Sequence, residues 1–164
     1  MNAGDLLFGR RLRQNHALEH ATVTILTERH PRLRVAARSS ARGFVIYADL
    51  DPALVRPAAE DALRRLRRGE AHLAIHPHCG TNLAVGTSVA LVGSFFALTA
   101  VRPRVRAASA LVSSLAGIVA ARPLGQVVQR HVTTLPDVAG VRIVSVARRR
   151  RLGMTIVEVR TEAG

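Results

Sequence analysis

The chain has 164 residues, among them 24 lysines and arginines against 11 aspartates and glutamates, so its formal net charge is +13. A chain of this length forms one domain, or one small domain with an appendage, and buries enough surface to fold without disulfides. A single cysteine excludes an internal disulfide, the 48% share of hydrophobic residues excludes a disordered basic tail, and the charge favours nucleic acid or acidic lipid headgroups as partners.

The first 82 residues predict the first part of a small α+β domain. In chain order we expect a helix over residues 5–29, strands over 33–37 and 43–50 joined by a turn at 39–43, and a helix over 51–68. The first helix is expected to end before Pro31, because proline disfavours helical geometry in the preceding residue. Asp51 and Pro52 form a strong helix start, with Asp51 as the N-cap. Residues 1–13 contain Asp5 and three arginines and lack the apolar stretch of a signal peptide.

Residues 83–128 predict a transmembrane helical hairpin. Residues 83–101 are 19 uncharged residues, close to the length of about 20 that crosses a bilayer. A second uncharged run begins at residue 107 and is long enough for a span when it extends to Val128, with Arg122 reaching toward the interface. The small residues that would let the two helices pack closely are Gly86, Ala90, Ser94, Ala97, Ala110, Ser114, Gly117 and Ala121. The alternative is a buried hairpin in a soluble protein, which the small size of the remaining chain disfavours.

Residues 129–164 predict a β-hairpin that completes the α+β domain, with strands over 141–147 and 154–161. Two spans place both flanking segments on one side of the membrane. The tip of the hairpin holds three arginines and the flanks hold 20, so the positive-inside rule predicts a cytoplasmic soluble part. We therefore expect a two-span cell-membrane protein that contacts the lipid bilayer and its anionic headgroups. Two spans do not form a pore alone, so transport would require a homo-oligomer.

The first cluster of chemically active residues lies in residues 15–22, which read NHALEHAT. His16 and His20 are four residues apart, so on a helix they project from one face and could bind one metal ion. Glu19 completes a His-x-x-Glu-His pattern, which is the inverted zinc-peptidase motif. In that motif the glutamate is the general base for a zinc-bound water. The third ligand of such peptidases is a downstream glutamate, for which Glu60 and Glu70 are the candidates.

The second cluster lies in residues 76–82, which read HPHCGTN, directly before the first apolar helix. His76 and Cys79 are zinc ligands by type, and His78 offers a further nitrogen. The four ligands His16, His20, His76 and Cys79 would form a closed tetrahedral site. If only three of them bind the metal, the fourth position is open to water. Asn82 is expected to cap the apolar helix, after a turn over residues 80–82.

These two motifs, with the turn at residues 42–44 and the Gly69-Glu70 step, resemble a family of bacterial membrane proteins of unknown function. The resemblance covers roughly residues 12–100. It implies membrane association and no particular activity. In the family pattern the position of His78 is often asparagine, which argues against an essential role for His78.

Two functions follow. The first is a membrane-anchored zinc-binding protein that acts as a hydrolase on a peptide or protein substrate, with Glu19 as the catalytic base and His16, His20, His76 or Cys79 as ligands. The second is a non-catalytic membrane protein with a structural or sensing metal site, in which Glu19 would lie outside the ligand shell or in a salt bridge. An ordinary polar network without metal is a further alternative. Nucleic-acid binding is disfavoured, because there are five aromatic residues and no binding motif.

Overall fold

A computed structural model of the chain describes residues 3–151 and 153–163. The chain divides into two units. The first contains Met1–His76 and Arg130–Gly164, and the second contains Pro77–Gln129. The fold is α+β as predicted, with one four-stranded antiparallel sheet in the first unit and two long apolar helices in the second.

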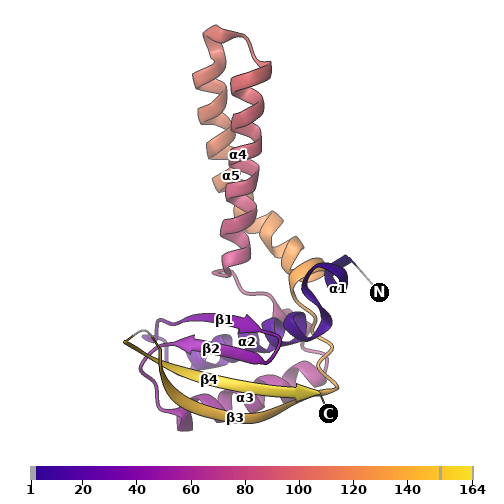
Figure 1. The fold of residues 1–164 in the computed structure, drawn as a ribbon, viewed down its shortest axis with the longest axis vertical. Coiled ribbons are helices and arrows are strands. Elements are labelled where there is room, and N and C mark those ends of the chain that lie inside the picture. The colour runs from indigo at the N-terminus through magenta and orange to yellow at the C-terminus, as the bar shows by residue number, and fades with distance from the viewer. Residues whose placement is uncertain (1–2, 152, 164) are drawn as a thin grey trace. The chain divides into compact units, whose positions relative to one another are not determined.

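The sheet of the first unit combines strands from before and after the two apolar helices in the sequence (Figure 1). Its strands are β1 (Ala36–Ser40), β2 (Gly43–Tyr47), β3 (Val141–Arg151) and β4 (Met154–Ala163), in the order β1-β2-β4-β3. Neighbouring strands are antiparallel throughout, and Phe44 of β2 lies opposite Val159 of β4. The two segments that flank the apolar helices therefore complete one sheet.

Two helices cover one face of this sheet, α2 (Arg10–Arg29) and α3 (Pro52–Arg67) (Figure 1). The core lies between these helices and the sheet, because alternate strand residues such as Phe44 and Ile46 are buried against apolar residues of the helices. Asp51 caps α3 as predicted, since its carboxylate accepts a hydrogen bond of 2.9 Å from the backbone nitrogen of Ala53.

The predicted helix over residues 5–29 is wrong as a single element. The structure has a short helix α1 (Ala3–Phe8) and then α2, separated by Gly9. Gly9 has φ 72°, in the left-handed region that glycine adopts without strain, and this backbone conformation interrupts the helix.

The first strand also differs from its prediction over residues 33–37. β1 begins at Ala36, because it pairs with β2 through a turn at residues 41–42, which is shorter than the predicted turn. Gly43 follows this turn with φ 134°, and a Cβ atom there would lie 2.0 Å from the carbonyl oxygen of Val159. The close approach of β2 to β4 therefore requires glycine at this position.

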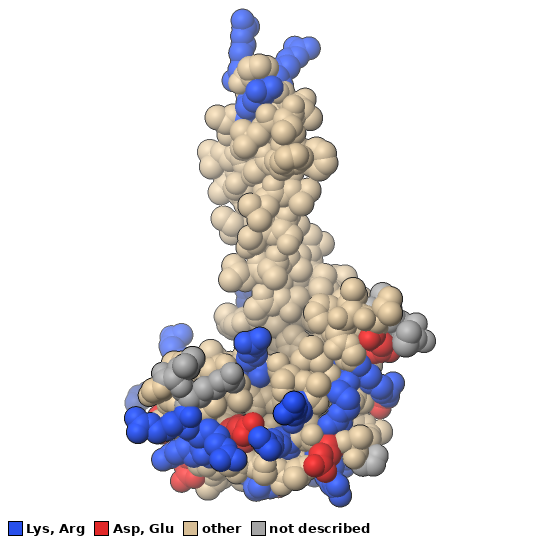
Figure 2. Space-filling view, in the orientation of Figure 1, with Lys and Arg blue, Asp and Glu red and all other residues tan. Residues whose placement is uncertain are grey.

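The second unit is a helical hairpin of α4 (Gly80–Ala100) and α5 (Arg106–Val128), joined by the short 3-10 helix η2 (Pro103–Val105). Both long helices are long and apolar enough to cross a membrane. Their large apolar side chains are mostly exposed, and basic side chains gather at the tip of the hairpin (Figure 2). Exposed apolar surface of this kind marks contact with a membrane or with another protein.

The predicted small residues form the contact between α4 and α5. A Cβ atom on Gly86 would lie 2.5 Å from the Cβ atom of Ala121, and one on Gly117 would lie 2.7 Å from that of Ala90. The hydroxyl groups of Ser94 and Ser114 are 3.2 Å apart. The helices thus pack at a distance that larger side chains would prevent.

The prediction that Asn82 caps α4 is wrong, because the helix begins earlier, at Gly80. Its N-cap is Cys79, whose sulfur accepts a hydrogen bond of 3.4 Å from the backbone nitrogen of Thr81. Asn82 lies in the first turn, where its amide nitrogen donates to the carbonyl oxygen of Pro77. Its amide oxygen accepts a hydrogen bond of 2.6 Å from Gln129, so Asn82 joins the two ends of the hairpin.

Candidate metal centre

Helix α2 carries polar side chains into the interior of the first unit. Arg13, Gln14, Asn15, Glu19, His20 and Thr22 are buried, although they share the helix with core residues such as Leu18 and Ile25. The amide of Asn15 donates to the carbonyl oxygen of Ser40 at 2.8 Å and accepts from the hydroxyl group of Thr161 at 2.7 Å. Asn15 therefore fixes α2 against the first and last strands of the chain, and so sets the position of the histidines that follow.

Three histidines of the first unit lie side by side. His16 and His20 project from one face of α2, with their ring centroids 4.3 Å apart. His76 follows the 3-10 helix η1 (Ala71–Ala74), and its ring centroid is 5.7 Å from that of His20. The structure thus brings together the three histidines that were predicted as ligands from the sequence.

Carbonyl oxygens fix the orientation of two of these rings. The Nδ1 atom of His16 is 3.0 Å from the carbonyl oxygen of Thr133, and the Nδ1 atom of His20 is 2.8 Å from that of Ala74. A carbonyl oxygen only accepts hydrogen bonds, so Nδ1 carries the proton in both rings. The lone pair that can bind a metal is then on Nε2 in each case.

Burial keeps both rings neutral. Desolvation lowers the pKa of His16, against a smaller opposite effect of its bond to Thr133. Desolvation lowers the pKa of His20 to about 3, and the positive charge that His16 carries when protonated acts in the same direction. A neutral imidazole is the form that binds metal, so both histidines are ready to act as ligands at neutral pH without losing a proton first.

Glu19 lies beside the histidines and is also buried. Burial raises its pKa to about 7, and the hydrogen bond that Ser39 of β1 donates to its carboxylate acts in the opposite direction. Sequence reasoning missed Ser39, because its approach to Glu19 depends on how β1 packs against α2. The alternation of β1 is the signal that could have found it, since Ser39 lies opposite the buried Phe44.

Four further residues were predicted as possible ligands, namely Cys79, His78, Glu60 and Glu70. Cys79 belongs to the second unit, where it caps α4, and His78 is exposed. Glu70 accepts a hydrogen bond of 2.8 Å from Arg65, and Glu60 pairs with Arg56, which lies one turn earlier in α3. Both glutamates that were candidates for the third metal ligand are therefore paired with arginines.

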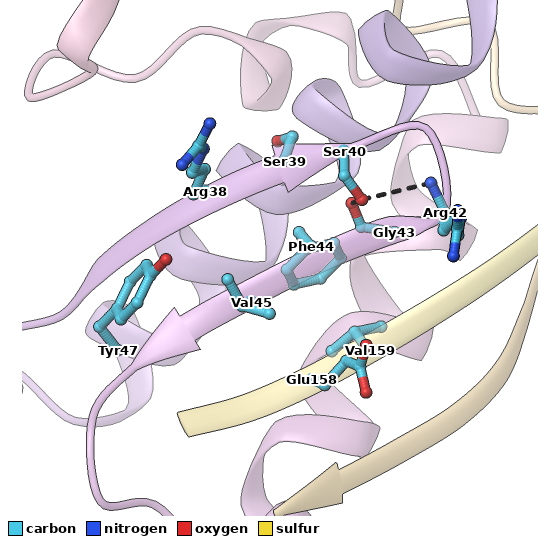
Figure 3. A pocket seen from close by; sticks show the side chains of 10 residues that line it. All are labelled: Arg38, Ser39, Ser40, Arg42, Gly43, Phe44, Val45, Tyr47, Glu158 and Val159. Carbon is cyan, nitrogen blue, oxygen red and sulfur yellow. Dashed lines mark hydrogen bonds between the residues drawn. The ribbon is translucent and has the colours of Figure 1, made fainter. Parts of the chain in front are cut away.

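A hollow of about 300 Å³ lies over strands β1, β2 and β4 (Figure 3). Arg38 and Arg42 contribute positive charge to its lining, and Glu158 contributes a carboxylate. Ser39 lines it as well, but His16, His20 and His76 do not. The hollow and the histidine cluster are therefore separate features of the first unit.

Comparison with known proteins places the chain among relatives without a described activity. The family described as "Domain of unknown function (DUF6391)" matches residues 11–146, which include both sequence motifs. An uncharacterized protein of Picosynechococcus sp. is 35% identical over 141 residues, which cover 79% of this chain and 67% of that protein. No solved structure matches the chain.

Proposed function

This chain belongs to the DUF6391 family, and on that premise we propose that it is a membrane-anchored metal-binding protein. The site is the cluster of His16, His20 and His76, and the ion is zinc. The observation that carries the proposal is the contact of two adjacent rings, the half-buried His16 and the buried His20, with backbone carbonyl oxygens through Nδ1, which leaves Nε2 as the ligand atom. This is how histidine ligands are oriented in metal sites in general.

The spacing of the rings supports a shared ion. Zinc binds imidazole nitrogen at about 2.0–2.1 Å in tetrahedral sites, which places the centroids of two ligating rings roughly 5 Å apart. The separations of 4.3 Å and 5.7 Å bracket this value. A set of imidazoles favours zinc and similar transition metals over calcium or magnesium, which prefer oxygen ligands.

Cys79 is the proposed fourth ligand. It follows His76 by three residues, so an extended connection reaches at most about 11 Å, and a compact one brings the thiolate to the same ion. Three histidines and one thiolate would fill a tetrahedral site. A filled site does not admit water, so in this form the metal has a structural or sensing role.

Hydrolysis is the second candidate function, and one observation favours it. A carboxylate with a pKa of about 7 matches a general base that works near neutral pH, and Glu19 is the glutamate of the His-x-x-Glu-His motif. The contact with Ser39 favours the non-catalytic role instead, because it ties one of the two carboxylate oxygens of Glu19 to β1. We therefore place the non-catalytic role first.

The second unit provides the membrane anchor in this proposal. α4 and α5 have the length and apolar composition of spans, and basic residues lie at the tip between them. Most arginines lie in the segments that form the first unit, which supports a cytoplasmic location for it and contact with anionic headgroups.

Metal analysis of the full chain, purified in detergent, tests the proposal. We expect about one zinc ion per chain in the wild type and in His72→Ala, a control on the exposed His72. We expect much less metal in His16→Ala, His20→Ala and Cys79→Ala. Equal metal contents in all five proteins would overturn the proposed site.

A second measurement separates the two roles of the site. Glu19→Gln is expected to retain zinc in either case, since Glu19 is not a proposed ligand. If the wild type cleaves a peptide or ester in a substrate screen and Glu19→Gln does not, the hydrolase function replaces the structural one.

A further inference from the structure

Three consecutive apolar side chains at the start of the first unit are exposed. Leu6 is 74% exposed, Leu7 68% and Phe8 43%. They occupy the end of α1, before the helix break at Gly9. The other exposed large apolar residues that the structure describes in this unit, such as Leu54, do not form a consecutive run. A run of this kind marks a surface that meets an apolar partner.

Helix α1 is held firmly against the rest of the first unit. The carboxylate of Asp5 accepts a hydrogen bond of 2.6 Å from Arg13, whose buried guanidinium also donates to the carbonyl oxygens of His131 and Thr134. Gly4 packs so closely that a Cβ atom there would lie 2.5 Å from the carbonyl oxygen of Val132. These contacts fix the polar side of α1 on residues 131–134 and leave its apolar side chains outward.

The segment that α1 contacts is close to a candidate span along the chain. α5 ends at Val128, and Val132 follows four residues later. Four residues extend at most about 14 Å, and the intervening residues form a helical turn, which is shorter. Covalent geometry alone therefore keeps α1 near the point where α5 would leave the bilayer.

We infer that Leu6, Leu7 and Phe8 insert into the interface of the lipid bilayer and form a membrane contact in addition to the helical hairpin. The inference rests on the proposed membrane anchor. Apolar side chains of an interfacial segment are buried about 5–10 Å deep, at the boundary of headgroups and acyl chains. Arg130, two residues before Val132, is exposed, and its positive charge favours an anionic lipid surface over a neutral apolar protein groove. Arg10 pairs with Asp137 and Arg11 donates to the carbonyl oxygen of Thr161, so these two side chains are engaged within the first unit.

Single tryptophans in the full chain test this inference, because the natural sequence has none. Phe8→Trp reports on the proposed interfacial contact. Leu54→Trp is a matched control, since Leu54 is 44% exposed and lies on α3, and Phe95→Trp reports on the span itself. Each protein is reconstituted into phosphatidylcholine–phosphatidylglycerol vesicles with and without lipids brominated near the top of the acyl chains.

We expect brominated lipid to reduce the emission of Phe8→Trp and Phe95→Trp roughly twofold, and to leave Leu54→Trp unchanged. Quenching of Phe95→Trp without quenching of Phe8→Trp would overturn the interfacial contact and leave the membrane anchor in place. An unquenched Phe95→Trp would overturn the membrane anchor and this inference with it. Equal quenching of Leu54→Trp and Phe8→Trp would overturn the specific role of α1.

Discussion

The substitution Glu19→Gln measures the cost of burying a carboxylate beside the histidine cluster. Burial raises the pKa of Glu19 from 4.5 to about 7 in the folded protein without metal. The difference between these values corresponds to roughly 3 kcal/mol between the protonated and ionised forms. Glutamine has nearly the same shape as the protonated acid and does not titrate.

The sign of the pH dependence follows from the direction in which folding shifts the pKa of Glu19. A group whose pKa is raised by folding stabilises the folded state fully below pH 4.5, and this contribution is lost as the pH rises through 7. The free energy of unfolding of the wild type, relative to Glu19→Gln, should therefore fall by roughly 3 kcal/mol between pH 4.5 and pH 8. The histidines titrate in both proteins, so their contributions largely cancel in the difference.

Thermal unfolding of the full chain in detergent, followed by circular dichroism with EDTA present, measures this difference. EDTA is needed because a bound cation would itself lower the pKa of the carboxyl group. If the unfolding temperatures of the two proteins run parallel from pH 4.5 to pH 8, Glu19 does not have a raised pKa and the reasoning from its burial fails.

Three further changes have expected outcomes. Gly43→Ala should lower the free energy of unfolding by about 3 kcal/mol, because its Cβ atom would meet β4. Gly9→Ala, with open space around it, should lower this free energy by about 1 kcal/mol. Equal losses in the two variants would contradict the argument. Gly117→Leu should separate α4 from α5 and lower the unfolding temperature in detergent. Val119→Leu, on an exposed site of α5, should leave the unfolding temperature unchanged, and identical melting curves for the two variants would refute close packing. EDTA should lower the unfolding temperature of the zinc-loaded wild type and leave that of His20→Ala unchanged; an equal shift in both would exclude a stabilising ion at this site.

Local patterns in the sequence predicted most of the fold. The alternation of residues 154–161, the Asp51 cap and the uncharged runs from residue 83 each reflect contacts between near neighbours in the chain, and the structure confirms the elements they predict. The helix break at Gly9 was missed, because glycine also occurs inside helices at a modest cost. The cap of α4 was assigned wrongly, because the helix begins at Gly80 with Cys79 as its cap. Asn82 instead accepts a hydrogen bond from Gln129, which is 47 residues away in the sequence.

Spacing in the sequence predicted one part of the candidate site, and the rest depends on tertiary contacts. The pair of His16 and His20 follows from helical spacing, and the structure places their rings 4.3 Å apart. The approach of His76, the carbonyl partner Thr133 and the contact between Ser39 and Glu19 depend on tertiary packing, which spacing in the sequence does not reveal. Binding of a metal by this cluster stays a prediction.

The strand order of the sheet has a consequence for synthesis. β4 lies between β2 and β3, so the partner that pairs β2 with the rest of the sheet is the last of the four strands to be synthesised. β1 and β2 alone form a two-stranded hairpin, which is marginally stable in water. Both apolar helices are translated before β3 and β4 exist, so in the proposed membrane-anchored form they are available for insertion while the first unit is still incomplete. Closure of the sheet thus follows synthesis of both helices, and insertion of the proposed anchor does not compete with a folded first unit.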